Sequence, residues 1–290
     1  MENGVIIKAL SGFYYVASKG EIISCKAVGK FKSRKITPLV GDRIEFERQS
    51  DGTGFIKTIL ERKNCFIRPP LANIDLLIIV ASCAPPVTDT LLIDKMTVLA
   101  EASDCEAIIC VNKTDLESAE KITEIYSKAG YEVYPVSAET GDGLDELKIA
   151  MQSRVCAFTG NSGVGKSSLL NKLIPDAGAE TGIISDKIGR GKNTTRHTEL
   201  FLLNDNTFIA DTAGFSSLEL GEATSIKKEE LSSFYPEFNK FLGQCRFPDC
   251  RHVSEPGCAV KEAAGSEISA ERYSNYLKIY DSVKSITDWS

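Results

Sequence analysis

Residues 156–173, CAFTGNSGVGKSSLLNKL, combine glycines, a lysine and serines at a spacing that suits phosphate binding. The segment 160–167 matches G-x-x-x-x-G-K-[ST], after an apolar run typical of a strand and before a run with helical spacing. In that context successive backbone N–H groups and the helix N-terminus face an anion. Lys166 would contact the β- and γ-phosphates of a nucleotide, and the Ser167 hydroxyl would bind Mg²⁺. The predicted phosphate-binding residues are Gly160, Asn161, Ser162, Gly163, Val164, Gly165, Lys166, Ser167 and Ser168.

A second polar segment, VNKTD, follows the apolar run EAIICV and contains Asn112, Lys113, Thr114 and Asp115. Ligands of α/β sheets bind at the carboxyl ends of the strands, where this segment would lie. Asp115 can accept hydrogen bonds from N1–H and the exocyclic amine of guanine, whereas adenine offers no matching donors. Lys113 can pack along the base and Asn112 can tie the loop to its neighbours. An ordinary polar loop is the alternative for this segment taken alone.

Two more segments that follow strand-like runs extend the predicted site. VSAETG places Ser137 and Ala138 where their backbone N–H groups could bind the guanine oxygen, which favours a guanine site over an ordinary loop. IADTAGF places Asp211 where it could hold Mg²⁺ through water and Gly214 where its N–H could contact the γ-phosphate. The alternative for Asp211 is a simple turn at the end of a strand.

The order of these motifs differs from that of an ordinary GTPase, which begins with the phosphate loop. Here both base-binding segments precede the phosphate loop, and DTAGF comes last. A site assembled from strand ends survives a cut in a surface loop and the joining of the former termini. The sequence therefore predicts a circularly permuted GTPase.

A cluster of three cysteines and a histidine lies near the C-terminus, whereas the other six cysteines are scattered singly. Cys245, Cys250, His252 and Cys258 supply the four ligands of a closed tetrahedral zinc site, which would be structural. A disulfide or a coincidence of composition is the alternative. Because a short segment has little core of its own, zinc binding there would be coupled to folding.

The elements that must position these residues divide the chain into three predicted domains. Residues 1–65 contain five short strand candidates and suit a barrel of the oligonucleotide-binding (OB) type. Residues 66–220 alternate strands and helices, which predicts a mostly parallel α/β sheet with an antiparallel hairpin at 199–211. Residues 221–290 are predicted to be helical, at 227–235 and 269–285, around the zinc cluster. NCFIRPP at 64–70 is interpreted as a linker.

Charge divides along the same lines. The net charge is −6, but residues 1–65 hold 12 basic and 7 acidic residues, against 22 and 33 in the remainder. This asymmetry indicates that the N-terminal domain meets a polyanion. The stretch CKAVGKFKSRK would supply phosphate contacts to RNA and one stacking ring, Phe31, although lysines kept for solubility are the alternative.

With these motifs in place, the chain closely resembles the RsgA (YjeQ) family of small ribosomal subunit biogenesis GTPases. The resemblance covers essentially the whole chain and rests on NKTD, GNSGVGKSS, GRGKNTTRH, DTAGFSSLEL and CRFPDCRHVSEPGCAV. It implies hydrolysis of GTP to GDP with Mg²⁺, stimulation by the small ribosomal subunit, contact with its rRNA near the decoding region during late maturation, and one structural zinc.

At the positions where GTPases carry the residue that activates water, this sequence differs from both Ras-like GTPases and the RsgA family. Phe215 stands where Ras-like GTPases carry a water-orienting glutamine, and is interpreted as a packing anchor. The family is understood to use a histidine in a GRGKHTT-like context, where this sequence has Asn193; His197 is the substitute candidate. Thr194 and Thr195 both remain candidates for Mg²⁺, with Thr195 favoured by the resemblance. The catalytic candidates are Asn193, Thr195 and Lys166, and slow hydrolysis is expected.

Composition and length suit a soluble, cytoplasmic protein, expected to act as a monomer without a membrane partner. The predicted function is a GTPase whose nucleotide state governs association with the small subunit and release from it. Since DTAGF leads directly into the C-terminal domain, loss of the γ-phosphate is predicted to move that domain. A nucleotide-gated RNA-binding module with little hydrolysis is the alternative, and an ATPase is a second.

Overall fold

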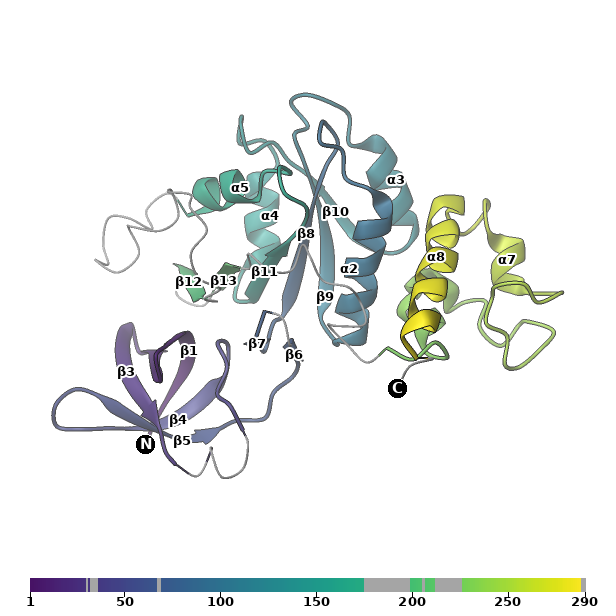
Figure 1. Ribbon diagram of the computed structural model, residues 1–290. Coiled ribbons are helices and arrows are strands. Elements are labelled where there is room, and N and C mark those ends of the chain that lie inside the picture. Colours follow the sequence, from purple (N-terminus) through teal and green to yellow (C-terminus); the bar gives the residue numbers. More distant parts are fainter. Residues whose placement is uncertain are drawn as a thin grey trace.

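The structure is a computed structural model. It describes residues 1–29, 31, 36–66, 69–174, 199–204, 207–211 and 226–287, and all of their side chains except those of Asn204, Asp211 and 284–287. Figure 1 shows the N-terminal strands, a central helix-covered sheet and a C-terminal helical part in sequence.

The N-terminal strands close into the predicted five-stranded barrel. They are β1 (Glu2–Leu10), β2 (Phe13–Ser18), β3 (Glu21–Ala27), β4 (Arg43–Arg48) and β5 (Gly54–Ile59). The order is β1-β2-β3-β5-β4 and a β1–β4 pairing closes it; β3 and β5 run parallel. Alternate apolar residues such as Ile6, Val16 and Phe46 fill the interior. The prediction that Phe31 is a stacking ring is wrong: the ring is 6% exposed and belongs to this core, because burial is the favourable place for an apolar ring.

The segment interpreted as a linker contains regular structure. β6 (Cys65–Phe66) pairs antiparallel with β7 (Leu71–Ala72), and Phe66 is buried. The Asn64 amide donates to Ile74 O at 2.8 Å and accepts from Ile74 N at 2.9 Å. In the described part of this segment, these contacts form a small two-stranded sheet that ends just before the first strand of the central sheet.

The central sheet has the predicted mostly parallel arrangement. Its strands are β8 (Leu76–Ser82), β9 (Glu106–Asn112), β10 (Glu132–Pro135), β11 (Val155–Thr159), β12 (Glu199–Asn204) and β13 (Thr207–Asp211). The order is β10-β9-β8-β11-β13-β12, in which only β12 is antiparallel, so the predicted antiparallel hairpin is confirmed. It is not a free edge, because β12 also pairs with β1 through Glu199 and Lys8.

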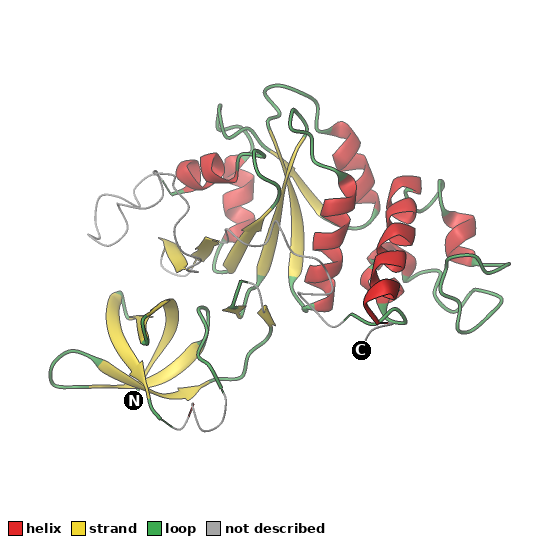
Figure 2. Ribbon diagram, viewed as in Figure 1, coloured by secondary structure: helices red, strands yellow, loops and turns green. Residues whose placement is uncertain are grey.

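Helices cover both faces of this sheet (Figure 2). They are α2 (Thr90–Ala102), α3 (Glu120–Lys128), α4 (Leu144–Met151) and α5 (Lys166–Leu173). Along β8, Leu77 and Ile79 pack with the side of α2 and α3, whereas Ile78 and Val80 pack with the side of α4 and α5. A strand buried on both faces needs the continuous apolar run that the sequence shows.

The C-terminal part contains η2 (Leu231–Phe234), η3 (Pro236–Phe238), α7 (Ala259–Ala263) and α8 (Ala270–Thr287). The predicted helix at 227–235 is wrong, since only short 3₁₀ turns form there. Pro236 follows the segment at once and disfavours helical backbone at Tyr235, which is extended (φ −118°, ψ 94°). A buried aromatic cluster forms here instead, in which Tyr235 and Phe238 pack against Tyr276 of α8. Among the described helices, none is long and apolar enough to span a bilayer.

Candidate functional site

The predicted base and phosphate loops lie together at one edge of the central sheet. β9, β10 and β11 are parallel, so the loops that follow them leave from their carboxyl ends on the same side. The buried Asn112 amide donates to Val164 O at 2.8 Å and accepts from Ala138 N at 3.0 Å. One side chain at the end of β9 therefore joins both neighbouring loops, as predicted for Asn112.

The phosphate loop has a backbone that side chains would obstruct. Gly160 and Gly165 have φ of +141° and +95°, a region that favours glycine. A Cβ would lie 2.2 Å from Val80 O at Gly160, and 2.2 Å from the Asn112 amide nitrogen at Gly165. Gly165 caps α5 without a side-chain hydrogen bond, which leaves the N–H groups of the first turn for an anion. This cradle fits the phosphates of a nucleotide.

The lysine of this loop is held by two carbonyls of the loop itself. Lys166 Nζ donates to Gly160 O and, at 2.7 Å, to Asn161 O. Burial lowers the pKa of Lys166 from its ordinary value, since desolvation disfavours the ammonium form. Ser167, in the first turn of α5, is exposed, and its hydroxyl is the oxygen donor that Mg²⁺ prefers.

The base loop presents Asp115 to solvent. Lys113 has a φ of +71° and donates through Nζ to Pro85 O at 2.7 Å, while Thr114 N donates to Val136 O. Asp115 Oδ1 accepts from the Ser137 hydroxyl at 2.6 Å. That bond orients the carboxylate and leaves its other oxygen for a ligand.

The backbone N–H groups predicted to bind the guanine oxygen already have partners within the protein. Ser137 N donates to Asp142 O at 3.0 Å, inside its own turn. Ala138 N donates to Asn112 Oδ1 and would have to exchange or share that acceptor to reach a base. Ser137 therefore contributes through its side chain, whose hydroxyl orients Asp115. The sequence did not reveal this contact because the two residues are 22 positions apart.

A further loop at this edge, residues 83–88 between β8 and α2, was also missed. Its carbonyl at Pro85 accepts from Lys113, and a Cβ at Gly163 would lie 3.0 Å from the Pro86 ring. The loop is thus in contact with the base loop and beside the phosphate loop. Paired prolines directly after a buried strand were the signal in the sequence that could have drawn attention to it.

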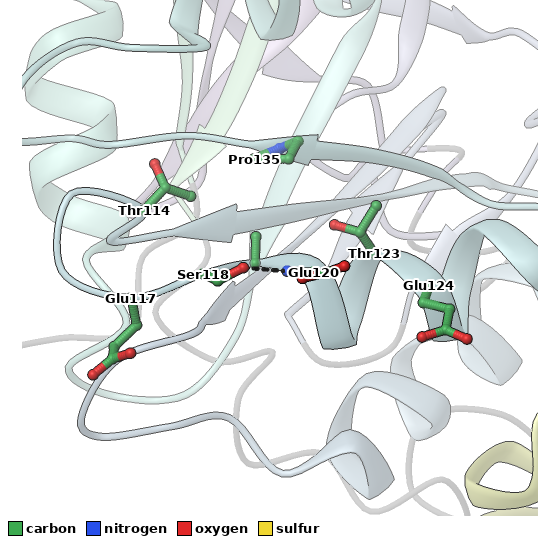
Figure 3. A pocket seen from close by; sticks show the side chains of 8 residues that line it. Thr114, Glu117, Ser118, Glu120, Thr123, Glu124 and Pro135 are labelled. Carbon is green, nitrogen blue, oxygen red and sulfur yellow. Dashed lines mark hydrogen bonds between the residues drawn. The ribbon is translucent and has the colours of Figure 1, made fainter.

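Beside the base loop is a shallow hollow whose lining includes three glutamates (Figure 3). It is formed by Thr114, Glu117, Ser118, Ala119, Glu120, Thr123, Glu124 and Pro135. Its three carboxylates would repel a polyphosphate, so this hollow does not suit the phosphates of a nucleotide.

The remaining predicted nucleotide residues are placed only in part. Asp211 ends β13, which pairs with β11 next to the phosphate loop, through Ala157 and Ala210; the Asp211 side chain lies outside the described residues. Also outside them are Asn193, Thr194, Thr195, His197, Gly214 and Phe215.

The predicted metal ligands lie together in the C-terminal part. Ligand atoms of Cys245, Cys250, His252 and Cys258 are all within 4.8 Å of one another. His252 Nδ1 is 3.5 Å from Cys245 Sγ and 3.4 Å from Cys258 Sγ. Tetrahedral zinc with bonds of the usual length separates such ligands by about 3.5 Å, so the set fits zinc. The disulfide alternative is wrong, because all three cysteines are free.

The backbone around this cluster is fixed by neighbouring polar groups. The Tyr273 hydroxyl donates to His252 O at 3.0 Å, and the Glu255 carboxylate accepts from the N–H groups of Arg251, Val253 and Ser254. Desolvation raises the pKa of Glu255, but these backbone hydrogen bonds outweigh it and lower the pKa to about 2. Such outer contacts orient metal ligands.

Comparisons with known proteins find similarity along nearly the whole chain. The sequence model of the RsgA N-terminal domain matches residues 3–56, and that of the RsgA GTPase matches residues 59–221. The chain is 47% identical over 291 residues to "Small ribosomal subunit biogenesis GTPase RsgA 2" of Oceanobacillus iheyensis, covering 98% of each protein. It is 42% identical over 296 residues to the protein named RsgA of Bacillus subtilis, again covering 98% of each.

Two solved structures have a fold similar to that of this chain. YjeQ from Thermotoga maritima superimposes with a TM-score of 0.84 at 36% identity, covering 98% of each chain. YloQ, described as a circularly permuted GTPase, gives a TM-score of 0.82 at 36% identity and covers 98% of this chain and 96% of its own.

Proposed function

The chain belongs to the RsgA family of GTPases, and from that premise we propose which of its residues bind and hydrolyse GTP. It is a circularly permuted GTP hydrolase that carries an N-terminal OB-type barrel. The observation that carries the residue assignment is the position of Asn112, which hydrogen-bonds to the phosphate loop and to the second base loop at once. The two halves of one nucleotide site thereby meet although their order in the chain is reversed.

Guanine selectivity is assigned to Asp115, oriented by the Ser137 hydroxyl. Asp115 Oδ2, and Oδ1 which also accepts from Ser137, would accept hydrogen bonds from the two donors of guanine. Lys113 would lie along the base. The proposed nucleotide contacts are Asn112, Lys113, Thr114, Asp115, Ser137, Ala138, the phosphate loop from Gly160 to Ser168, Asp211 and Gly214.

Phosphate chemistry is assigned to Lys166, which would exchange its bonds to loop carbonyls for bonds to phosphate oxygens. Ser167, Thr195 and Asp211 would hold Mg²⁺, which neutralises charge on the phosphates when bound. Asn193 would position the attacking water. Because an amide does not accept a proton near neutral pH, we expect slow hydrolysis, with His197 as the other candidate and Thr194 as the other ligand for Mg²⁺.

The partner follows from the relatives, whose printed names call them small ribosomal subunit biogenesis GTPases. We propose that this chain binds the small subunit and its rRNA in the cytoplasm as a monomer, late in maturation. GTP would favour association and GDP release, which requires different affinities of the two forms for the subunit. The proposed domains are 1–65 for RNA, 66–220 for the nucleotide and 221–290 around one structural zinc.

The barrel offers a surface for RNA that does not involve Phe31. Phe13, Lys26 and Phe55 are neighbours across β2, β3 and β5, and all three are exposed. Lys26 Nζ lies 4.9 Å from the centre of the Phe13 ring. Exposed rings beside a cation suit stacking on unpaired bases, and the basic stretch 30–35 follows β3 directly.

The test is GTP turnover with and without purified small subunits, for wild type, Asn193→His and His197→Ala. We expect low turnover alone, marked stimulation by the subunit, and faster hydrolysis in Asn193→His. Phe13→Ala/Phe55→Ala should reduce stimulation by weakening subunit binding, whereas it should leave the unstimulated rate unchanged.

Base assignment is tested in the same assay with Asp115→Asn. Its preference should change from guanine to xanthine nucleotides, with guanine affinity falling by about 100-fold or more, because a donor then faces a donor. Glu117→Gln, an exposed carboxylate two residues away, is the matched control. Retention of guanine preference by Asp115→Asn would overturn the base assignment. Nucleotide-dependent subunit binding without turnover would favour the assembly-module alternative.

A further inference from the structure

A buried charge cluster joins the C-terminal part to the central domain. The side chains of Arg272 on α8 and Asp94 on α2 are fully buried, and Glu237 in η3 is 3% exposed. Arg272 donates to Asp94 Oδ1 at 2.7 Å and to both oxygens of Glu237, at 2.7 and 3.0 Å. Its guanidinium also lies 4.7 Å from the centre of the Tyr235 ring. The contact is specific, because each buried charge has an opposite charge and hydrogen bonds.

The same interface holds the N-terminal end of α2. The Thr90 hydroxyl donates to Glu271 Oε1 at 2.6 Å and accepts from the Asn275 amide at 3.1 Å, both on α8. Asn275 also donates to Asp94 Oδ2 at 2.7 Å. The Tyr126 hydroxyl, on α3, is within hydrogen-bonding distance of Thr90 O and Asp94 Oδ1. Thr90, the first residue of α2, is thus held by two side chains of α8.

From Thr90 the chain leads back into loop 83–88. Thr88 and Ser82 close this loop: Ser82 N donates to the Thr88 hydroxyl at 2.8 Å, and Thr88 N donates to Ser82 O at 3.1 Å. Within the closed loop, Pro85 O accepts from Lys113 Nζ and Pro86 lies against Gly163. A shift of the start of α2 would therefore displace contacts to both nucleotide-binding loops.

We propose that Thr90, held by Glu271 and Asn275 of α8, is a positioning residue for the nucleotide site, through which the C-terminal domain sets the affinity for guanine nucleotides. The proposal rests on the assignment of the nucleotide to the loops around Lys113 and Gly163. It adds a second connection to the C-terminal domain, distinct from the covalent one that follows DTAGF.

The physical reason is preorganisation. Nucleotide binds the conformation in which loop 83–88 supports both loops, and the apparent affinity falls by the fraction of molecules in that conformation. Losing the Thr90 hydroxyl lowers this fraction by up to about fivefold, since a typical buried hydrogen bond favours its conformation by that factor, and by less where the competent conformation predominates. Linkage is reciprocal, so a ligand that displaces α8 would weaken nucleotide binding, and bound nucleotide would weaken the binding of that ligand.

The test compares Thr90→Val with Thr90→Ser in the full-length, zinc-loaded protein. Valine keeps the shape of the threonine side chain but removes its hydroxyl, whereas serine keeps the hydroxyl. With a fluorescent GDP analogue and a GTP analogue, we expect Thr90→Val to raise Kd for both nucleotides, by up to about fivefold, through slower association. Thr90→Ser should bind like wild type, and zinc content should be the same in all three proteins.

The matched control is Tyr131→Phe, which removes the hydrogen bonds of this hydroxyl to Glu101, at 3.2 Å, and to Thr97, both on α2 and farther than Thr90 from loop 83–88. It keeps the aromatic ring beside Arg272. It should lower thermal stability without a change in Kd. If Thr90→Val does not fold, Glu271→Ala and Glu271→Gln replace the pair, because that side chain is 37% exposed and only glutamine keeps an acceptor for Thr90.

The outcomes separate this inference from the function on which it rests. Wild-type affinity in Thr90→Val and Glu271→Ala, with loss of binding in Lys166→Ala, would refute the positioning role and leave the nucleotide site intact. An equal loss of affinity in Tyr131→Phe would also refute it, because general destabilisation would then suffice. Normal binding by Lys166→Ala and Asp115→Asn would instead refute the assigned nucleotide site.

Discussion

Asn112 and Lys166 are polar side chains whose partners in this structure are main-chain groups of the nucleotide loops. Asn112 is 2% exposed, and its amide is satisfied by Val164 O and Ala138 N. Lys166 donates to the carbonyls of Gly160 and Asn161. Such bonds compensate for burial and hold the loops ready for ligand, since unpaired buried polar groups are costly.

The depressed pKa of Lys166 predicts a pH dependence of stability in the nucleotide-free protein. Burial holds the folded-state pKa below the ordinary lysine value of about 10.4, so between the two values the unfolded chain binds more protons. The unfolding free energy of wild type, relative to Lys166→Met, should therefore rise as pH increases toward about 10. Urea denaturation of both proteins from neutral to alkaline pH measures this difference.

Lys172→Met is the control for that measurement, because Lys172 is exposed on the same helix. A difference between wild type and Lys166→Met that stays constant or falls with pH would contradict the assigned burial of Lys166.

At the scale of elements, α2 is the helix on which two parts of the molecule meet. One side covers β8 and β9, while Asp94, Thr97 and Thr90 face α8. Desolvation alone would lower the pKa of Arg272, but the carboxylates of Asp94 and Glu237 raise it well above the ordinary value. The guanidinium therefore remains charged, and the interface depends on complete pairing of its charges.

Replacing Arg272 with methionine should lower the unfolding free energy by about 3–5 kcal/mol, because Asp94 and Glu237 would stay buried without a cation. Removing all three charges together, in Asp94→Asn/Arg272→Met/Glu237→Gln, should cost less than the single change. Urea denaturation with zinc present measures both. A single variant within about 1 kcal/mol of wild type would show that the cluster is not buried in solution.

At the scale of the whole molecule, the barrel continues the central sheet through one pair of residues. Lys8 of β1 pairs with Glu199 of β12, and their side chains form an ion pair at 2.9 Å. The two side chains are 19% and 21% exposed. This joint connects the proposed RNA-binding barrel to the strand hairpin that ends at Asp211.

Reversing one charge of this joint, in Lys8→Glu, should widen the range of barrel positions seen by small-angle X-ray scattering, because two carboxylates would then face each other. The exchange Lys8→Glu/Glu199→Lys should restore the wild-type profile. In a double-mutant cycle the pair should contribute about 0.5–1 kcal/mol, as expected for a partly exposed ion pair. Identical scattering of wild type and Lys8→Glu would show that other contacts, such as the hydrogen bond from the Asn73 amide to Gly41 O, suffice to fix the barrel.

Much of the fold and the site could be predicted because the signals are local. The alternation of strands and helices, the phosphate-loop motif and the Cys/His cluster each depend on residues close together in the sequence. The structure shows the strands and brings the four predicted zinc ligands together. Phe31 was misplaced for the opposite reason. Its basic neighbours suggested RNA, but its burial depends on the closed barrel.

By itself, the sequence determined which loops have the residue types and spacing for phosphate, guanine and zinc binding and in what order they occur, since backbone geometry and ligand type are set by adjacent residues. Only the tertiary structure decided that the Ser137 hydroxyl orients Asp115, that loop 83–88 supports Lys113, and that Arg272 meets Asp94 across 178 positions. Contacts between residues so distant in the chain leave no pattern in its spacing, because they depend on how strands and helices are packed in space.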